Sequence, residues 1–224
     1  MIERAILEAR DLVKRYIVGD RSLTVIDGVS LAVEKGEFVV VTGPSGSGKT
    51  TLISLLSGLD RPDSGRVFLG GEEITGLSEE EIAPLRNGTI GFVFQYYHLV
   101  PSLSALENVM FPAELRGDGE ARAKAEALMA RAGISDRGEN FPHQLSGGEK
   151  QRTAVCRALV NEPSIVFADE PTGNLDSASG AAVLDLMLSL QRDRGTALVM
   201  VTHSGEIASR ADRVLTMADG HLDR

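Results

Sequence analysis

Residues 43–50 read Gly-Pro-Ser-Gly-Ser-Gly-Lys-Thr, which is the spacing of glycines and polar residues that a phosphate-binding loop needs. Glycines lack a Cβ atom and let the backbone turn tightly, so successive N–H groups can converge on a phosphate. In such a loop Lys49 contacts the β- and γ-phosphates of a nucleotide, and the hydroxyl of Thr50 binds Mg²⁺. The run predicts a nucleoside triphosphate site; the alternative is a glycine-rich turn with a solvated lysine.

The residues on either side of this run support the nucleotide interpretation. Residues 37–42 form a short, β-branched apolar run suited to a buried parallel strand, and residues 52–56 have the spacing of an apolar helix face. The predicted order is strand, loop and helix. A helix starting near Ser47 would direct its positive end and its unpaired N–H groups at the anion.

Two adjacent carboxylates follow another buried strand. The apolar residues 165–168 are followed by Asp169 and Glu170, which places both acids at the carboxyl end of a strand, where parallel sheets bind ligands. Asp169 can hold Mg²⁺ directly or through water, and Glu170 can accept a proton from an attacking water molecule. A purely structural pair of acids is the alternative.

Gln95 and His203 each follow a further predicted strand, residues 89–94 and 197–201 respectively. A glutamine can orient water or bind a metal ion, and a histidine can donate a hydrogen bond to a γ-phosphate. Taken alone, either side chain is equally compatible with an ordinary hydrogen-bonded polar residue.

Composition excludes several classes of protein. The chain has 224 residues, a net charge of -9 and a pI near 5.0, which argues against a dedicated nucleic-acid binder because phosphate neutralisation needs clustered lysine and arginine. The longest apolar run has five residues, far short of the ~20 needed to span a bilayer. With no signal segment and the single Cys156, we expect a reducing, cytoplasmic setting.

Strand and helix patterns alternate along most of the chain. Residues 5–13 and 23–33 read as an antiparallel pair joined by a turn at Gly19 and Asp20, with Tyr16 between the two strands. Ser78 and Glu81 form a capping box that opens a helix. Residues 96–148 change to helical spacing, and strand–helix order resumes after them. We predict one α/β domain over residues 1–224, with a mostly parallel core sheet, an N-terminal antiparallel β subdomain and a helical insertion at about 96–148.

The run Leu-Ser-Gly-Gly-Glu-Lys-Gln-Arg at residues 145–152 resembles the signature of the ABC ATPases, which are P-loop NTPases. Together with the phosphate loop and the strand-end residues, the resemblance covers essentially the whole chain. It implies ATP and Mg²⁺ as ligands, and a homodimer that closes head to tail when ATP is bound. A helix N-terminus such as the one at Ser146 is physically suited to the γ-phosphate held by the other subunit. Tyr16, 33 residues before Lys49, corresponds to the aromatic residue that stacks on adenine.

The resemblance implies the following site residues in this sequence. Catalysis is assigned to Lys49, Gln95, Glu170 and His203, and Mg²⁺ binding to Thr50, Gln95 and Asp169. ATP binding is assigned to Tyr16, Gly43, Pro44, Ser45, Gly46, Ser47, Gly48, Lys49, Thr50, Thr51, Gln95, Asp169, Glu170 and His203. Contact with the ATP of the opposite subunit is assigned to Ser146, Gly147, Gly148, Glu149 and Asp176.

Within the ABC ATPases, residues 95–109 and 167–176 look like the LolD/MacB group, and the resemblance is closest to subunits of lipoprotein-releasing systems. This implies an integral membrane partner and a location on the cytoplasmic side of the inner membrane. Regulators of the cell-division type and soluble ABC ATPases of DNA repair or translation remain as alternatives. The sequence departs from common ABC patterns at Glu149, where glutamine is common although glutamate is usual in this subgroup, and at Ser204, where aspartate is common. Cys156 replaces a frequent alanine, and we expect an inert buried thiol.

Residues 96–101, Tyr-Tyr-His-Leu-Val-Pro, follow Gln95 directly. Aromatic and aliphatic residues of this kind are typical interface anchors. We expect this segment to dock a short helix of the membrane partner. The alternative is that these side chains fill the core of the helical lobe.

Overall fold

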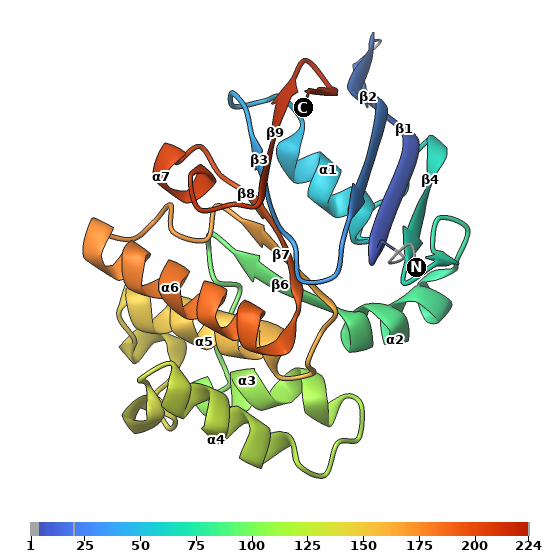
Figure 1. Ribbon diagram of the computed structural model, residues 1–224. Helices are drawn as coiled ribbons and strands as arrows, with labels where there is room; N and C mark the ends of the chain where they lie inside the picture. Colours follow the sequence, from blue (N-terminus) through green and yellow to red (C-terminus); the bar gives the residue numbers. More distant parts are fainter. Residues whose placement is uncertain (1–4, 20, 224) are drawn as a thin grey trace. The chain divides into compact units, whose positions relative to one another are not determined.

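The computed structural model describes residues 5–19 and 21–223 (Figure 1). The chain folds into two compact units. The first unit comprises Met1–Arg86 with Ala197–Arg224, and the second comprises Asn87–Thr196.

An antiparallel sheet in the first unit has the strand order β2-β1-β4-β5. Its strands are β1 (Leu7–Val18), β2 (Arg21–Val33), β4 (Ser64–Leu69) and β5 (Glu72–Glu73). The predicted antiparallel pair is confirmed, but the strands are longer than expected. Tyr16 therefore lies within β1, opposite Leu23 of β2, because the ladder continues almost to the turn at Gly19. The other residue assigned to that turn, Asp20, lies outside the described residues.

A parallel arrangement in the first unit is built around β3 (Phe38–Thr42). It pairs on one side with β8 (Ala197–Val201) and on the other with β9 (Arg213–Ala218), both in parallel. The first four residues of β3 and all of β8 are buried, which explains their unbroken apolar runs. The short strand β10 (His221–Asp223) adds antiparallel to β9 and was not predicted, since three residues leave no periodic pattern.

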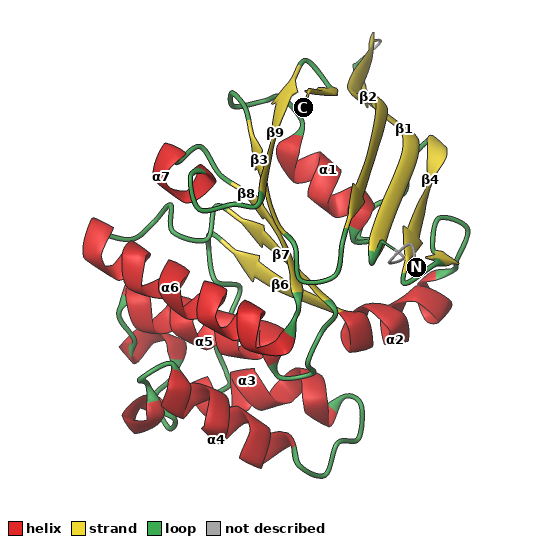
Figure 2. Ribbon diagram, viewed as in Figure 1, coloured by secondary structure: helices red, strands yellow, loops and turns green. Residues whose placement is uncertain are grey.

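Helix α1 (Lys49–Leu56) lies between the two sheets of the first unit (Figures 1 and 2). Its apolar residues are buried on both sides, as expected for a helix enclosed between sheets. The helix begins at Lys49 and not near Ser47, because Gly48 has a φ of 102° and ends the regular geometry there. The smaller helices are α2 (Glu79–Thr89), with the predicted capping box between Ser78 and Glu81, and α7 (Gly205–Ala208).

The second unit combines a pair of parallel strands with a group of helices (Figure 2). Its elements are β6 (Ile90–Phe94), α3 (Ala105–Glu114), α4 (Ala121–Arg131), the 3₁₀ turns η1 (Ser135–Arg137) and η2 (Pro142–Gln144), α5 (Gly147–Leu159), β7 (Ile165–Asp169) and α6 (Ser177–Arg194). Residues 96–148 are all described and contain no strand, as predicted. Helix α5 packs against α3, α4, α6 and β6, so it is the central helix of this unit.

The hydropathy of the helices and the burial of Cys156 bear on the expectations about membranes and thiols. Within residues 5–19 and 21–223, no helix combines the length and hydropathy that a bilayer span requires. Cys156 is fully buried in α5, and burial raises the pKa of its thiol to about 12. An inert structural cysteine is the result, as predicted.

Candidate functional site

The phosphate loop connects β3 to α1 in the first unit, and its glycines are required by sterics. A Cβ atom at Gly43, where φ is 145°, would lie 2.1 Å from the carbonyl oxygen of Met217. At Gly48 it would lie 2.7 Å from the carbonyl oxygen of Val25. No side chain fits at either position, so the tight path of the loop depends on glycine.

Lys49 lies at the first turn of α1 and its side chain folds back over the loop. Its Nζ donates hydrogen bonds to the carbonyl oxygens of Gly43 at 2.9 Å and Pro44 at 2.8 Å. The hydroxyls of Thr50 and Thr51 follow directly on the helix. An ammonium group, backbone N–H groups and hydroxyls form a donor set that fits a polyphosphate, and a hydroxyl oxygen suits Mg²⁺. The other loop residues assigned to ATP are the exposed Pro44, Ser45 and Gly46 and the buried Ser47.

His203 belongs to the same unit and lies at the same edge of its sheet. Val41 of β3 pairs with Val201 of β8, so the residues following both strands leave the sheet side by side. His203 is exposed there, two residues after β8. The hydroxyl oxygen of Ser204 accepts a hydrogen bond from the N–H of Ile207 and caps α7. Serine thus performs the capping that an aspartate would perform at this position, which explains how the departure at Ser204 is tolerated.

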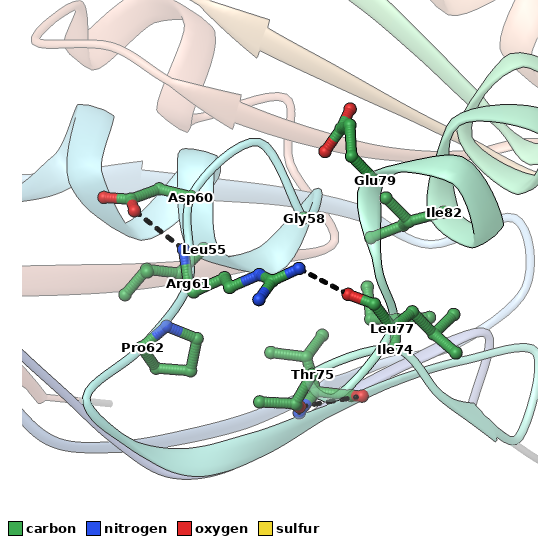
Figure 3. Close-up of a pocket in the computed structure, with 11 residues that line it drawn as sticks. Leu55, Gly58, Asp60, Arg61, Pro62, Ile74, Thr75, Leu77, Glu79 and Ile82 are labelled. Carbon is green, nitrogen blue, oxygen red and sulfur yellow. Dashed lines mark hydrogen bonds between the residues drawn. The ribbon is translucent and has the colours of Figure 1, made fainter.

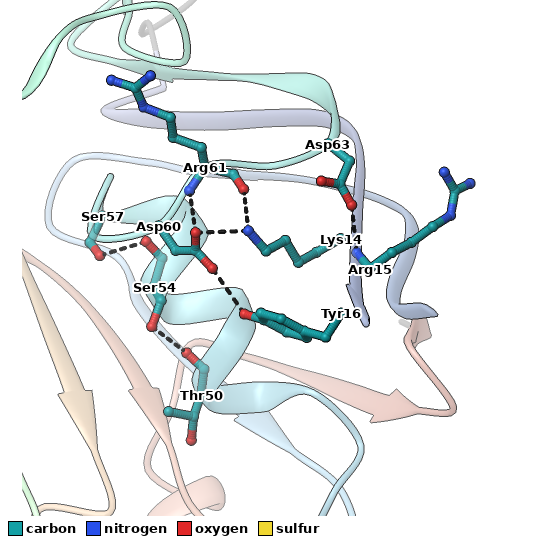
Figure 4. Close-up of polar contacts among 9 residues, drawn as sticks. All are labelled: Lys14, Arg15, Tyr16, Thr50, Ser54, Ser57, Asp60, Arg61 and Asp63. Atoms are coloured by element: carbon teal, nitrogen blue, oxygen red, sulfur yellow. Dashed lines mark hydrogen bonds and ion pairs between the residues drawn. The ribbon is translucent and has the colours of Figure 1, made fainter. Parts of the chain in front are cut away.

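Tyr16 is held by a small polar network (Figure 4). Its hydroxyl donates to the carboxylate of Asp60 at 2.9 Å, and the Lys14 ammonium lies 5.2 Å from the ring centroid. Lys14 also donates to Asp60 at 2.8 Å, so the three side chains form one connected group. Burial, followed by the hydrogen bond to Asp60, raises the pKa of the Tyr16 hydroxyl. Tyr16 as a whole is 39% exposed, which leaves surface for stacking.

Arg61, next to Asp60, is anchored beneath α2 (Figure 3). Its Nη2 donates to the carbonyl oxygen of Leu77 at 2.7 Å, at the edge of a cavity whose volume is only about 20 Å³. That space corresponds to about one water molecule, so it is not a ligand site. The tether instead fixes the turn that carries Asp60. Residues 60–65, Asp-Arg-Pro-Asp-Ser-Gly, have the composition of a turn, and nothing in that pattern indicates that Asp60 bonds Tyr16.

In the second unit, β6 and β7 bring Gln95 and the carboxylates together. Phe94 pairs with Asp169, so Gln95 and Glu170 follow neighbouring strand ends. Two hydrogen bonds join Gln95 and Asn174. The side-chain Nε2 of Gln95 donates to Oδ1 of Asn174 at 3.1 Å, and Nδ2 of Asn174 donates to the backbone carbonyl oxygen of Gln95 at 3.0 Å. Glu170 has a φ of 45°, a left-handed conformation that costs free energy in a non-glycine residue and is enriched at functional sites. The role of Asn174 was not foreseen.

The signature residues form the N-terminus of α5. Ser146 is the N-cap: its hydroxyl oxygen accepts from the N–H of Glu149 at 3.3 Å, and Glu149 accepts from the N–H of Ser146 at 2.8 Å. Arg137 donates to the second oxygen of Glu149 at 2.7 Å. The Arg137 hydrogen bond, with the Ser146 N–H second, lowers the pKa of Glu149 to about 2. The departure from glutamine at Glu149 thus adds an ion pair to the capping box.

Asp176 lies close to this helix end within the same unit. It caps α6 by accepting a hydrogen bond from the N–H of Ser179 at 2.9 Å, and that bond lowers the pKa of its carboxyl group. A Cβ atom at Gly148 would lie 3.5 Å from the Ser179 side chain. The capped N-termini of α5 and α6 are therefore neighbours. Two helix N-termini this close could both contact the same anion.

The Glu149 ion pair leads to a prediction about pH. Because the folded pKa of Glu149 is depressed from 4.5 to about 2, its contribution to stability is complete above pH 4.5 and is lost as pH falls toward 2. We expect Glu149→Gln, which keeps the capping oxygen, to lower the free energy of unfolding by about 1 kcal/mol at pH 7, a value discounted for the solvent exposure of Arg137. The difference from wild type should shrink through this pH window, as measured by urea unfolding.

Glu126→Gln is the matched control, because Glu126 also pairs with an arginine but both side chains are more than half exposed. Its unfolding free energy should show little pH-dependent difference from wild type. Equal behaviour of the two variants would contradict the role given to Arg137.

The chain is similar to known proteins over nearly its whole length. A family model described as ABC transporter matches residues 26–173. A protein of Pseudomonas fluorescens named lipoprotein-releasing system ATP-binding protein LolD is 49% identical over 224 residues, covering 99% of both chains. Proteins of the same name from Xanthomonas axonopodis pv. citri and Shewanella sp. are 48% and 45% identical, covering 97% and 99% of this chain and 90% and 96% of theirs.

A solved structure provides the corresponding comparison in space. The ATP-binding cassette MJ0796, in a dimeric post-hydrolysis state bound to ADP and Pi, superimposes with a TM-score of 0.91. It is 36% identical in sequence, and 97% of each chain is covered.

Proposed function

Because this chain belongs to the ABC transporter family and is one of its ATP-hydrolysing subunits, we propose that it powers lipoprotein release through an integral membrane partner. The α/β fold is that of the ABC ATPases. The observation that carries the proposal is the full-length similarity to LolD proteins, at 45–49% identity in three species. A complete phosphate loop and a capped signature helix support it.

In the proposed catalytic cycle, ATP binds between two copies of the chain. The phosphate loop and Lys49 of one copy hold the phosphates, and Tyr16 stacks on adenine. The second copy contacts the same ATP through the residues Ser146, Gly147, Gly148, Glu149 and Asp176. The dimeric, ADP- and Pi-bound state of MJ0796 supports this arrangement.

Glu170 is proposed as the base that deprotonates the attacking water, with Gln95 orienting it and His203 donating to the γ-phosphate. Thr50, Gln95 and Asp169 are the residues proposed to hold Mg²⁺, because hydroxyl, amide and carboxylate oxygens are the hard ligands that this ion prefers. When bound, Mg²⁺ neutralises charge on the transferring phosphoryl group. Catalysis by the protein is then mostly positioning and electrostatic stabilisation.

The proposed location is the cytoplasmic face of the inner membrane, where ATP is available and where the membrane partner would hold the chain. The net charge of -9 is consistent with a protein partner and with no nucleic acid.

The experiment is to purify the tagged chain from bacterial membranes and reconstitute it with the co-purifying membrane protein. We expect ATP-dependent release of a lipoprotein from the vesicles into the soluble fraction in the presence of a carrier protein. The control is the same complex with Glu170→Gln. ATP hydrolysis without any lipoprotein release would contradict the proposal while leaving the ATPase activity intact.

The docking surface for this partner is proposed at residues 96–101. Tyr96 is 69% exposed and His98 is also exposed, whereas Leu99 is half-buried. We expect Tyr96→Ala combined with His98→Ala to weaken association with the membrane partner by about tenfold or more, because aromatic anchors dominate interfaces. The free energy of unfolding should change by no more than about 0.5 kcal/mol, as is usual for substitutions at exposed sites.

Co-purification yield measures association with the membrane partner, and thermal unfolding measures the stability of the chain. Leu23→Ala is the control, because Leu23 is an exposed apolar residue of β2. A large loss of thermal stability in the double variant, or undiminished association, would favour the alternative that the segment belongs to the core.

A further inference from the structure

Tyr16 lies near the end of β1, among exposed side chains. Its partner across the ladder, Leu23, is exposed, and so is the next residue along the strand, Ile17. A side chain in such a position moves among several rotamers unless further contacts hold it. The contacts that hold Tyr16 come from the turn that follows α1 (Figure 4).

The carboxylate of Asp60 in that turn receives three hydrogen bonds. One oxygen accepts from the Tyr16 hydroxyl at 2.9 Å, and the other accepts from the Lys14 ammonium at 2.8 Å and from the N–H of Arg61 at 2.7 Å. Burial raises the pKa of the Asp60 carboxyl group, but the hydrogen bonds from Lys14 and Tyr16 outweigh burial, so the pKa lies below its usual value. The carboxylate is therefore charged at neutral pH, and its hydrogen bonds are of the stronger, charge-assisted kind.

The backbone of Asp60 is attached to α1. Its N–H donates to the carbonyl oxygen of Ser54 at 3.0 Å, and the N–H of Leu59 donates to the same oxygen at 2.9 Å. Helix α1 has 8 residues and is about 12 Å long. It begins at Lys49, at the end of the phosphate loop. One short helix thus carries a proposed phosphate contact at its start and Asp60 just beyond its end.

The same turn is also bonded to β1 on either side of Lys14. The N–H of Asp63 donates to the carbonyl oxygen of Val13 at 2.8 Å, and the N–H of Arg15 donates to the carboxylate of Asp63 at 2.6 Å. These bonds fix the turn relative to the strand that carries Tyr16. The place of the Tyr16 ring relative to the phosphate loop is thus set by two anchored elements, α1 and β1.

Lys14 covers one face of the Tyr16 ring. Its ammonium lies over the ring at 5.2 Å from the centroid, within the range of a cation–π interaction. It also donates to the carbonyl oxygen of Arg61 at 2.7 Å, and its side chain is only 12% exposed. A base that stacks on Tyr16 therefore uses the other face of the ring.

We infer that Asp60 is a positioning residue for the nucleotide base: through the Tyr16 hydroxyl it holds the aromatic ring at a fixed place relative to the phosphate loop, with the face opposite Lys14 open to adenine. The inference rests on the proposed stacking of Tyr16 on adenine and adds the residue that orders the ring before ATP binds. Ordering one such side chain in advance corresponds to about two- to tenfold in affinity. Asp60 itself needs no contact with the nucleotide.

The test compares a ligand that has the base with a ligand that lacks it. Calorimetry on the isolated chain measures the dissociation constants of Mg-ADP, which is not hydrolysed, and of Mg-pyrophosphate. We expect Asp60→Ala to weaken ADP binding by about fivefold and to change pyrophosphate binding by less than about twofold. A residue with a merely structural role would lower both affinities together, because damage to α1 also disturbs the phosphate loop.

Tyr16→Phe is the second variant, because it removes the hydroxyl that bonds Asp60 and keeps both the aromatic ring and the turn. It should weaken ADP binding by about the same factor as Asp60→Ala and leave pyrophosphate binding unchanged. The chain that carries both substitutions should bind ADP no more weakly than Asp60→Ala alone, since the two substitutions remove the same interaction.

Asp118→Ala is the matched control. Asp118 also accepts hydrogen bonds from a lysine, Lys124 at 2.6 Å, and from a backbone N–H, that of Glu120 at 2.8 Å, but it belongs to the second unit. This variant should keep the wild-type affinity for both ligands.

Wild-type ADP affinity in Asp60→Ala or in Tyr16→Phe would overturn the inference, and so would an equal loss of ADP and pyrophosphate affinity. Tyr16→Ala separates this result from the proposed function. It should weaken ADP binding by about tenfold or more, because stacking of a base on an aromatic side chain contributes that much. Wild-type affinity in Tyr16→Ala would overturn the proposed stacking together with the inference. Failure of lipoprotein release would count against the proposed function alone.

Discussion

Replacing Glu170 by glutamine is expected to reduce ATP hydrolysis by at least about a thousandfold while leaving ATP binding intact. Glutamine keeps the size and hydrogen-bonding capacity of the side chain but cannot accept the proton of the attacking water. Glu170 is the first residue after β7, beside Gln95 at the end of β6, and its backbone is left-handed. A variant that binds but cannot hydrolyse ATP should accumulate as a closed dimer.

Size-exclusion chromatography with Mg-ATP, together with phosphate release, measures both effects. Glu162→Gln is a matched control, because Glu162 is an exposed glutamate of the same unit whose φ, at 52°, is also positive. It should hydrolyse ATP at the wild-type rate. A Glu170→Gln variant that remains monomeric with ATP, or that turns over normally, would show that another group is the base.

Replacing Lys49 by alanine is expected to weaken ATP binding by about a hundredfold or more. A hydrogen bond to a charged group is worth about 1.5–3 kcal/mol, and Lys49 is expected to contact two phosphates. In the present structure its ammonium bonds the carbonyls of Gly43 and Pro44, so its position over the loop is already set. Binding therefore requires little rearrangement of this side chain.

Titration with a fluorescent ATP analogue measures this affinity directly. Lys35→Ala is the control, because Lys35 is an exposed lysine of the same unit away from the loop. It should bind ATP like the wild type. Wild-type affinity in Lys49→Ala would disprove the assignment of residues 43–50 to the phosphates.

Local sequence patterns were sufficient for several parts of this protein. The strand over residues 197–201, the capping box at Ser78 and the helix start at Ser146 were predicted correctly, because each depends on neighbouring residues only. The same holds for the glycines of the phosphate loop, whose spacing reflects the backbone path itself. The family resemblance, and with it the ATPase activity, also followed from short runs read in order.

Contacts between distant residues could not be predicted from these patterns. Asn174 bonds Gln95 across 79 positions, Asp60 bonds Tyr16 across 44, and Arg157 bonds Tyr97 across 60. No periodicity links such pairs, because the folded chain brings together elements whose separation in sequence is arbitrary. The start of α1 at Lys49 likewise depends on the left-handed Gly48, where a side chain would collide with Val25.

The sequence by itself thus determined the family and the residues proposed to carry the chemistry, since phosphate binding and proton transfer need particular residue types at fixed local spacing. The tertiary structure decided what holds those residues in place. Tyr16 is fixed by Asp60, Gln95 by Asn174, and Tyr97 by Arg157. Hydrogen bonds of this kind form only when strands and helices pack, because an isolated segment cannot supply both the donor and the acceptor.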